Sequence, residues 1–163
     1  MSWLLVPGDI LKTMPHAPSP PDLIFYDMFS TKTSGDLWTF SAFRQVFEAC
    51  AGRAAELFTY TCSTANRAAL LAAGFYLARG RNAGEKLETT IALTPAAFHS
   101  PLSKRREMLA DDWLEKWNRS AAKFPAEVEA DQHNYFEELI RRHKQFRKSA
   151  DAERLPCATR NSE

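Results

Sequence analysis

The sequence has few cysteines, and none of them is placed to pair with another. Cys50, Cys62 and Cys157 are odd in number and unrelated in spacing, and no Cys-x-x-Cys motif occurs. This pattern excludes a disulfide framework and a thiolate zinc site, and it favours a reducing compartment. The four histidines have no paired spacing either, so we expect no bound metal ion.

Long apolar runs and a strong net charge are also missing. No apolar stretch approaches the roughly 18 residues that a membrane-spanning helix needs, and residues 1–5 are too short a run for a signal peptide. The formal net charge of the 163 residues is +1, so a nucleic-acid partner would have to be held by a local basic patch. We therefore expect a cytoplasmic protein with no membrane association.

Short apolar runs that predict strands alternate with amphipathic segments that predict helices. The strands are expected at residues 3–6, 23–26, 57–60, 75–78 and 87–93. The run at 23–26 is apolar on both faces, as a central strand of a parallel sheet requires. A turn at residues 80–84 joins the last two strands into a hairpin. This order of elements predicts an α/β fold.

Two predicted helices between these strands have clear start and stop signals. Thr39 is a typical N-cap, and Trp38 before it can pack on Phe43 within the helix. A single face of this helix then carries Phe40, Phe43, Val46, Phe47 and Cys50. The second helix is expected at residues 65–73, and Gly74 ends it.

The chain changes character after residue 94, where Pro95 and Pro101 interrupt it. Amphipathic spacing predicts one helix over residues 104–119 and another after Pro125. We therefore divide the chain into a sheet-containing part at residues 1–95, a helical extension at 96–148 and a disordered tail at 149–163.

A polar segment after the run at 23–26 carries the most specific motif. It reads Asp27-Met-Phe-Ser-Thr-Lys-Thr-Ser-Gly-Asp-Leu-Trp-Thr39 and resembles the Asp-Gly-Phe-x-Pro-x-x-Asn-Pro-x-x-Trp-Thr signature of the MnmC/MnmD-type tRNA methyltransferases. Residues 8–10, Gly-Asp-Ile, resemble the turn after the third strand of that family, and residues 58–63 resemble its Thr-Tyr/Phe-Ser stretch. The resemblance covers residues 3–94, with its elements in the family's order.

The resemblance implies a class I, Rossmann-like methyltransferase sheet that ends in an antiparallel hairpin, with a C-terminal helical extension. Members methylate the aminomethyl group on the wobble uridine of certain tRNAs. It therefore implies S-adenosylmethionine as cofactor and tRNA as partner.

Here the family's Asn-Pro is Ser34-Gly35, and its basic turn is replaced at residues 81–86. No Gly-x-Gly follows an N-terminal strand, where this fold class binds its nucleoside, so we expect a truncated sheet with an incomplete cofactor site.

Asp27 is the first candidate for a catalytic residue. It follows a central strand, and open α/β sheets place their sites at the carboxyl ends of strands. A substrate amine with a lysine-like pKa of about 10 is protonated near neutral pH, and it must lose a proton before it can attack a methyl group. A buried carboxylate can orient the ammonium and accept that proton. The simpler alternative is a strand-end aspartate that caps a loop.

Five further residues take roles from the resemblance. Asp9, with Met28 and Phe29, is assigned to the cofactor, because Asp9 resembles the acidic residue that hydrogen-bonds the adenine amino group. Lys32 and Trp38 are assigned to the substrate, through a tRNA phosphate and through stacking on a base. The structural alternatives are a simple turn for Asp9, a solvated loop lysine, and a tryptophan that packs on the following helix.

Two basic clusters, at residues 104–106 and 141–148, are the other candidates for tRNA contact. Acidic residues are interspersed with them, which favours solvated helix faces instead. Trp113 and Trp117 lie one helical turn apart, a spacing that favours packing onto the sheet over stacking on bases.

Two functions stay open. The first is an active tRNA methyltransferase whose missing cofactor half comes from another chain or from upstream sequence. The second is a non-catalytic or partner-dependent half of the fold. In the full fold another strand lies between residues 3–6 and 23–26, so 23–26 would become an apolar edge, and such edges promote self-association or pairing with a partner chain. The motif disfavours a third reading, an unrelated small α/β protein.

Overall fold

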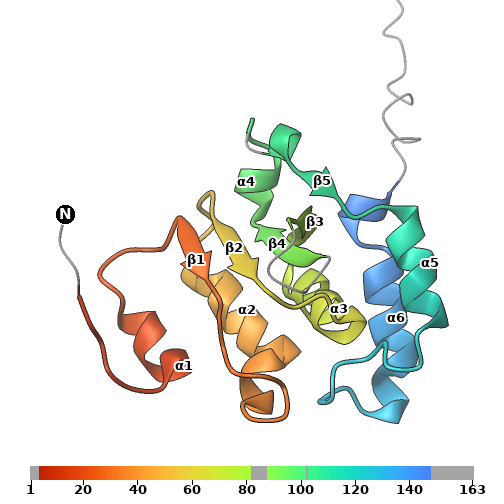
Figure 1. Ribbon diagram of the computed structural model, residues 1–163, viewed down its shortest axis with the longest axis horizontal. Helices are drawn as coiled ribbons and strands as arrows, with labels where there is room; N and C mark the ends of the chain where they lie inside the picture. Colours follow the sequence, from red (N-terminus) through yellow and green to blue (C-terminus); the bar gives the residue numbers. More distant parts are fainter. Residues whose placement is uncertain (1–3, 82–87, 102, 148–163) are drawn as a thin grey trace, which may run out of the picture.

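The computed structural model describes residues 4–81, 88–101 and 103–147. Its centre is a sheet with the strand order β1-β2-β4-β3-β5 (Figure 1). The strands are β1 Leu23–Phe25, β2 Glu56–Thr59, β3 Tyr76–Gly80, β4 Thr89–Leu93 and β5 Glu107–Met108. β1 and β2 are parallel, and β4 runs antiparallel to both β2 and β3. The predicted α/β fold and its antiparallel hairpin are confirmed.

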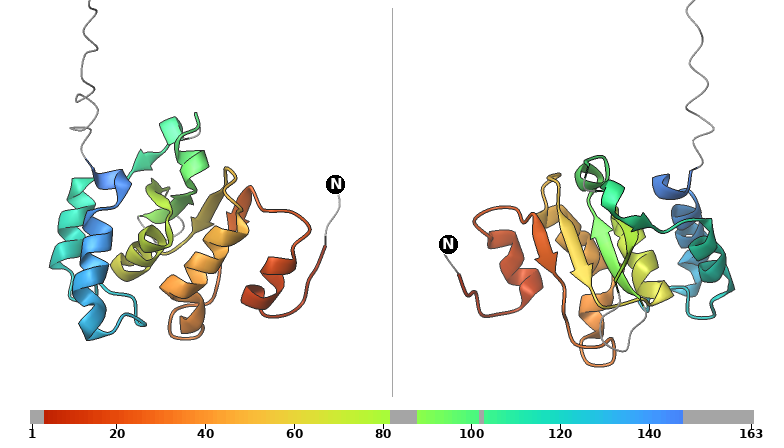
Figure 2. Two further views of the ribbon diagram at one scale, coloured as in Figure 1. Left: turned by 180° about the vertical axis from the view of Figure 1, so that it is seen from behind. Right: turned by 45° about the horizontal axis from the view of Figure 1, so that its top comes forward.

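The helices gather mainly on one face and at one end of this sheet. They are α1 Ile10–Thr13, α2 Phe40–Ala49, α3 Thr64–Ala73, α4 Pro95–Phe98, α5 Asp111–Arg119 and α6 His133–Arg141. In the right-hand view of Figure 2, α2 and α3 lie behind the strands, and α5 and α6 stand beyond α3. Short 3-10 turns at Met14–His16, Gly35–Trp38, Ser103–Arg105, Ala130–Gln132 and Lys144–Phe146 join these elements.

Local signals place the start of α2 and the end of α3 as predicted. Thr39 caps α2, because its Oγ1 accepts a hydrogen bond of 3.1 Å from the backbone N–H of Ala42. The rings of Trp38 and Phe43 pack edge to face with centroids 6.2 Å apart. Gly74 ends α3 in the left-handed region at a φ of 112°, where a residue with a Cβ would be strained.

One core joins the sheet to the C-terminal helices. The face covered by α2 and α3 contributes Leu57, Leu77 and Ala92, and it continues into side chains of α5 and α6 without a break. The buried contributors from that end are Leu109, Trp113, Trp117, Phe136 and Ile140. The two tryptophans therefore pack the helical extension onto the sheet-containing part, as their spacing predicts.

The strand predicted at residues 3–6 does not form over its described part. Residues 4–6 have no regular structure, and Leu5 is 88% exposed. Trp3 lies outside the described residues. An apolar run becomes a strand only when a neighbouring strand satisfies its backbone groups, and no described strand pairs with this segment.

The helix predicted over residues 104–119 begins only at Asp111. Glu107 and Met108 before it form β5, which pairs antiparallel with β3. The backbone N–H of Leu109 donates to the carbonyl of Leu77 at 2.9 Å, and Arg79 forms an ion pair of 3.2 Å with Glu107. This segment is a strand because the edge of β3 offers backbone partners that an amphipathic pattern does not reveal.

The helix expected after Pro125 is α6, and Phe136 and Ile140 are buried on its inner face. It ends at Arg141, so His143 lies outside the helix as the N-cap of the following 3-10 turn, to which Phe146 belongs. The predicted tail at 149–163 and most of the replaced turn, residues 82–86, lie outside the described residues.

His143 makes the stability of this fold dependent on pH. Its ring lies 5.1 Å from that of Tyr76 and 6.2 Å from that of Phe146. Burial, with a smaller effect from Lys144, lowers the pKa of His143 to about 4, whereas an unfolded histidine has a pKa of about 6.5. Between these values the unfolded chain binds more protons, so the free energy of unfolding falls as the pH drops.

We expect this loss to be about 2 kcal/mol between pH 7.5 and pH 5. Urea unfolding at the two pH values measures it. His143→Gln should remove most of the difference, and the exposed His16→Gln should leave it unchanged. An equal pH dependence in all three chains would contradict the assignment to His143.

Candidate active site at the carboxyl ends of β1 and β2

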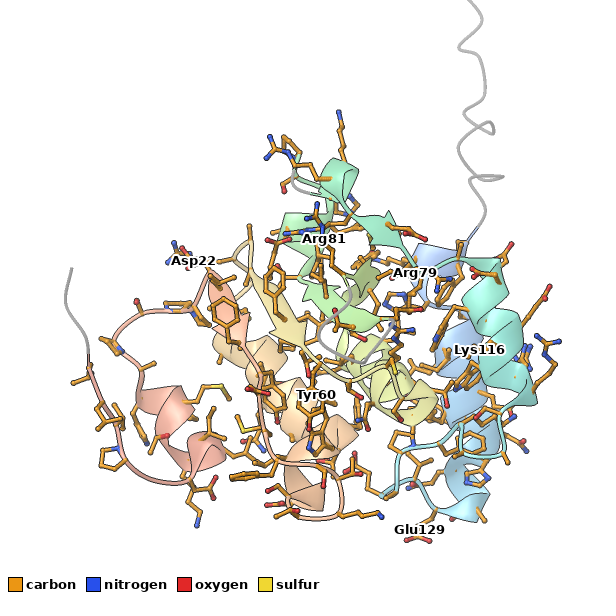
Figure 3. All side chains as sticks on the ribbon, viewed as in Figure 1. Asp22, Tyr60, Arg79, Arg81, Lys116 and Glu129 are labelled. Atoms are coloured by element: carbon orange, nitrogen blue, oxygen red, sulfur yellow. The ribbon has the colours of Figure 1, made fainter. Side chains whose placement is uncertain are left out.

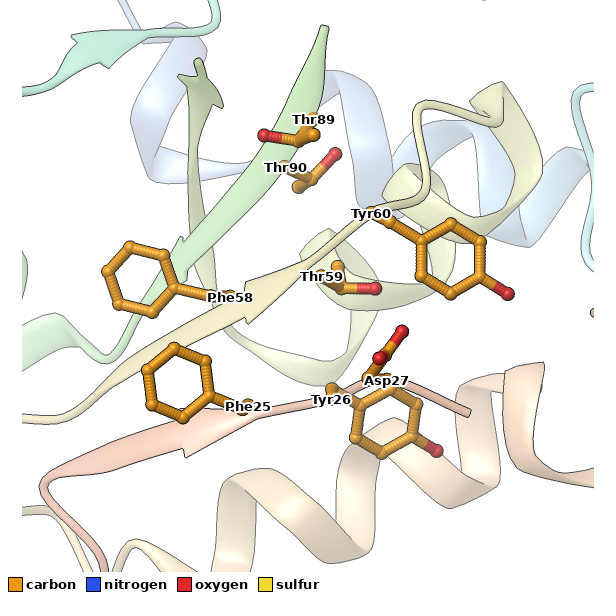
Figure 4. Close-up of a pocket in the computed structure, with 8 residues that line it drawn as sticks. All are labelled: Phe25, Tyr26, Asp27, Phe58, Thr59, Tyr60, Thr89 and Thr90. Atoms are coloured by element: carbon orange, nitrogen blue, oxygen red, sulfur yellow. The ribbon is translucent and has the colours of Figure 1, made fainter. Parts of the chain in front are cut away.

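A pocket of about 290 Å³ opens where β1 and β2 end (Figure 4). Because β4 is antiparallel to β2, its amino end reaches the same place. The residues that line the pocket are Phe25, Tyr26, Asp27, Phe58, Thr59, Tyr60, Thr89 and Thr90. Open α/β sheets bind their ligands at this end of the strands.

Asp27 is the one carboxylate among these lining residues. It is exposed to solvent and not buried as expected, because it lies just beyond the last paired residue of β1, Phe25. The rings of Phe25 and Phe58 form an apolar wall, with centroids 5.8 Å apart, and Tyr60 lies on the other side of Asp27 (Figure 4). A single negative charge beside aromatic faces suits a cationic group, which both the carboxylate and the rings attract.

Hydrogen bonds from side chains to carbonyls hold the segment after Asp27 in place. The hydroxyl of Tyr60 donates to the carbonyl of Met28 at 2.8 Å, and the Trp38 indole N–H donates to that of Phe29 at 2.6 Å. The hydroxyl of Tyr26 donates to the carbonyl of Leu37. The motif that the sequence singles out is therefore a loop fixed at both ends, with Asp27 at its start.

Burial and nearby carboxylates raise the pKa values of the two tyrosines at this site. Burial, reinforced by the charge of Asp36, raises the pKa of Tyr26 well above its ordinary value. Burial and then the charge of Asp27 raise the pKa of Tyr60. A phenol is protonated at neutral pH in any case, and these shifts keep both hydroxyls hydrogen-bond donors at more alkaline pH as well. Figure 3 shows Tyr60 at the lower end of the sheet, above the loop.

A buried arginine fixes the floor of the site. Arg67 on α3 is 1% exposed, and it donates to the Thr90 hydroxyl and to the Thr89 carbonyl, each at 2.9 Å. It also forms an ion pair of 2.5 Å with Glu88. Burial alone would raise the pKa of Glu88, but the hydrogen bonds and charges of Arg67 and Arg79 lower it overall.

Sequence reasoning missed this network, although a charged residue on the inner face of α3 is a signal for it. Arg67 occupies a helix position whose neighbours Ala68, Leu70 and Leu71 are apolar and buried. A charge in such a place needs a partner. Arg79, labelled in Figure 3 beside α5, extends the network by pairing with Glu88 at 3.1 Å and also with Asp112.

Of the two residues predicted to bind the substrate, one is buried and the other is exposed. Trp38 is 4% exposed, and its ring packs against Tyr26, Phe43 and Tyr60. These contacts support the packing interpretation, since the ring is not available for a base. Lys32 is exposed on the loop, and its contact with a phosphate stays a prediction.

Three arginines of the two basic clusters form ion pairs. Arg106 forms two hydrogen bonds of 3.0 Å with the carboxylate of Glu56. On α6, Arg141 pairs with Glu137 and Arg142 with Glu138. These pairs favour the interpretation as solvated helix faces.

Within the described ranges, no cluster of histidine, cysteine or acidic side chains could hold a metal ion, and no helix is long and apolar enough to cross a membrane.

The sheet order and the site at its strand ends define a methyltransferase-like α/β domain. The model of a family described as S-adenosyl-L-methionine-dependent methyltransferases matches residues 2–95, more than half of the chain. The chain belongs to this family.

A curated relative and a solved structure refine this comparison. The chain is similar to the tRNA 5-methylaminomethyl-2-thiouridine biosynthesis bifunctional protein MnmC of Ralstonia nicotianae, with 30% identity over 112 residues. That match spans 69% of this chain and 16% of the relative. The crystal structure of MnmC2 from Aquifex aeolicus shares the fold with a TM-score of 0.57 and 23% identity, over 82% of this chain and 41% of that one.

The residues predicted to bind S-adenosylmethionine do not converge in the structure. The Asp9 carboxylate accepts a 3.0 Å hydrogen bond from the Leu11 N–H and caps α1. The Phe29 ring is 76% exposed, and the Met28 side chain packs against the core. Among the described residues, these three side chains do not form a cradle for a nucleoside, and their roles toward the cofactor stay predictions.

Proposed function

We propose that this chain acts as an S-adenosylmethionine-dependent N-methyltransferase on the aminomethyl group of a tRNA wobble uridine. The observation that carries the proposal is the Asp27 carboxylate in its aromatic-walled pocket at the carboxyl end of β1. The MnmC relative supports it, because its name describes biosynthesis of 5-methylaminomethyl-2-thiouridine in tRNA. A cytoplasmic location, where tRNA is found, belongs to the same proposal.

Asp27 has two tasks in this function. Its carboxylate binds the substrate ammonium and orients the nitrogen toward the site of transfer. The nitrogen attacks only as the neutral amine, so one proton must leave, and Asp27 or a water molecule that it holds accepts that proton. S-adenosylmethionine is the methyl donor that the family uses. The fixed loop that follows Asp27 keeps the carboxylate in one position during these steps.

A methyl-transfer assay tests the proposal. The purified chain is incubated with S-adenosylmethionine that carries a labelled methyl group and with tRNA that contains 5-aminomethyl-2-thiouridine. We expect label in this tRNA and none in a transcript with unmodified uridine. Label in neither, from a folded chain, contradicts an independent enzyme. Equal label in both contradicts the aminomethyl substrate.

The open edge of β1 supports a second candidate function, a partner-dependent half of the same fold. β1 pairs with β2 on one side only, at the end of the described sheet. Leu23 and Phe25 on this strand are 49% and 74% exposed. A groove of about 850 Å³ lies between this strand and residues 4–21. An exposed apolar edge favours strand pairing between chains.

Sedimentation equilibrium distinguishes the two candidates. A partner-dependent half that associates with itself is expected to form dimers at micromolar concentration, and methyl transfer should then rise more than linearly with the concentration of the chain. A monomer with transfer strictly proportional to concentration contradicts self-association and supports the independent enzyme.

A further inference from the structure

Several threonine hydroxyls gather at the candidate active site, and most of them have clear partners. Thr61 Oγ1 accepts a hydrogen bond of 3.0 Å from the side-chain amide of Asn66. Thr89 Oγ1 donates to the carbonyl of Arg81 at 2.9 Å. Thr90 Oγ1 donates to the Thr61 carbonyl at 2.5 Å and accepts from Arg67. Each of these three hydroxyls therefore has at least one partner within the protein.

Thr59 at the end of β2 is the exception. Its side chain is 6% exposed, yet its Oγ1 has no hydrogen-bond partner among the described residues. Thr59 lines the same pocket as Asp27. In Figure 4 the Thr59 hydroxyl and the Asp27 carboxylate point into one space beside the Tyr60 ring. A buried hydroxyl without a partner is unfavourable, so its presence suggests that a ligand satisfies it.

The chemistry of the pocket identifies the kind of group that would do so. An ammonium group has hydrogen-bond donors and no acceptor. Asp27 offers an anionic acceptor, and Thr59 offers a neutral acceptor on the adjacent strand. The remaining walls include the aromatic rings of Phe25 and Phe58, which tolerate a cation at their faces.

We propose that Thr59 Oγ1 is the second acceptor for the ammonium group of the substrate, beside the Asp27 carboxylate. This assignment rests on the proposed methyltransferase function and names a residue that fixes the direction of the amine. With Asp27 and Thr59 each holding one hydrogen, the nitrogen cannot rotate freely about the bond to its carbon. Thr59 thus helps to select an amine over a neutral group of the same size.

The position of Thr59 is rigid enough for this task. β2 is paired on both sides, with β1 and with β4, and Thr59 itself lies opposite Thr90 in the ladder with β4. A threonine on a strand has few allowed values of χ1. The hydroxyl therefore occupies one of a small number of positions before any ligand arrives, which lowers the entropic cost of binding.

Binding of a small amine tests the assignment on the full chain. The probe is 5-aminomethyluridine, with 5-hydroxymethyluridine as the neutral control, and the affinity is measured by calorimetry. We expect Thr59→Val to weaken binding of the amine about 10-fold or more and Thr59→Ser to restore most of it. The weak affinity for the neutral control should not change.

Thermal unfolding of the same variants separates binding from folding. Thr59→Val exchanges an unpaired buried hydroxyl for a methyl group of similar size, so its melting temperature should equal or exceed that of the parent chain. A purely structural threonine would instead lose stability in this variant and affect both probes alike.

Each contrary result has its own meaning. Equal affinity of the parent chain and Thr59→Val for the amine overturns the role of Thr59, and methyl transfer to tRNA then still decides the proposed function. Weakened binding that Thr59→Ser does not restore also overturns it. Absence of amine binding by the parent chain overturns the assignment, and absence of methyl transfer as well would overturn the proposed function with it.

Discussion

Asp27→Asn is expected to lower the rate of methyl transfer about 100-fold or more, the usual range for loss of a general acid–base group. The amide keeps the size of the carboxylate and loses its negative charge. It can neither attract the substrate ammonium nor take up the proton that the amine must release. Since Asp27 is exposed, the substitution should leave the melting temperature unchanged.

Single-turnover methyl transfer to tRNA measures this effect. The matched control is Asp36→Asn, which removes an exposed charge from the same loop but outside the pocket, and we expect its rate to stay close to that of the parent chain. Equal loss in both variants would point to the overall charge of the loop. Full activity of Asp27→Asn would remove Asp27 from the mechanism.

Arg67→Met should give the largest loss of stability, about 3 kcal/mol in the free energy of unfolding. Methionine fills a similar volume, so the loss reports the polar partners and not a cavity. It leaves the Thr90 hydroxyl without its donor and Glu88 without its buried partner. The amino end of β4, which forms the floor of the pocket, should also lose its fixed position.

Urea unfolding measures this loss, with Arg44→Met as the control. Arg44 forms an ion pair of 2.8 Å with Glu48 one turn along α2, and both side chains are more than half exposed. Such a pair contributes about 0.5 kcal/mol or less. A similar small effect for both variants would show that the Arg67 network does not stabilise the fold.

Short-range signals in the sequence predict those parts of the fold that are decided locally. Thr39 caps α2 and Gly74 ends α3, because a side-chain acceptor and a left-handed residue act within one turn of the chain. The segment at 107–108 was wrongly predicted as helix, because its pairing with β3 joins residues about 30 positions apart. Residues 4–6 are as apolar as a strand but have no neighbour in the described sheet.

The candidate site divides in the same way. The position of Asp27 at the end of a strand could be predicted, because it directly follows an apolar run and begins a recognisable motif; its catalytic role stays a prediction. The role of Thr59 could not be predicted, since it depends on which polar groups are left without a partner once three strands meet. The sequence marks Arg67 only as a charge on an apolar helix face, and its partners Thr89 and Thr90 become clear only in the structure. Asp9, which was predicted to bind the cofactor, caps α1 in the structure. This agrees with the simpler alternative, that Pro-Gly-Asp is a turn.

Titration of the purified chain with S-adenosylmethionine tests the central claim most directly. Calorimetry gives the affinity, and thermal unfolding with and without the ligand gives an independent measure on the same sample. If the chain is a methyltransferase, we expect micromolar binding and a matching rise in the melting temperature. No heat of binding and no shift, from a chain shown to be folded, would contradict the independent enzyme and leave a partner-dependent half of the fold.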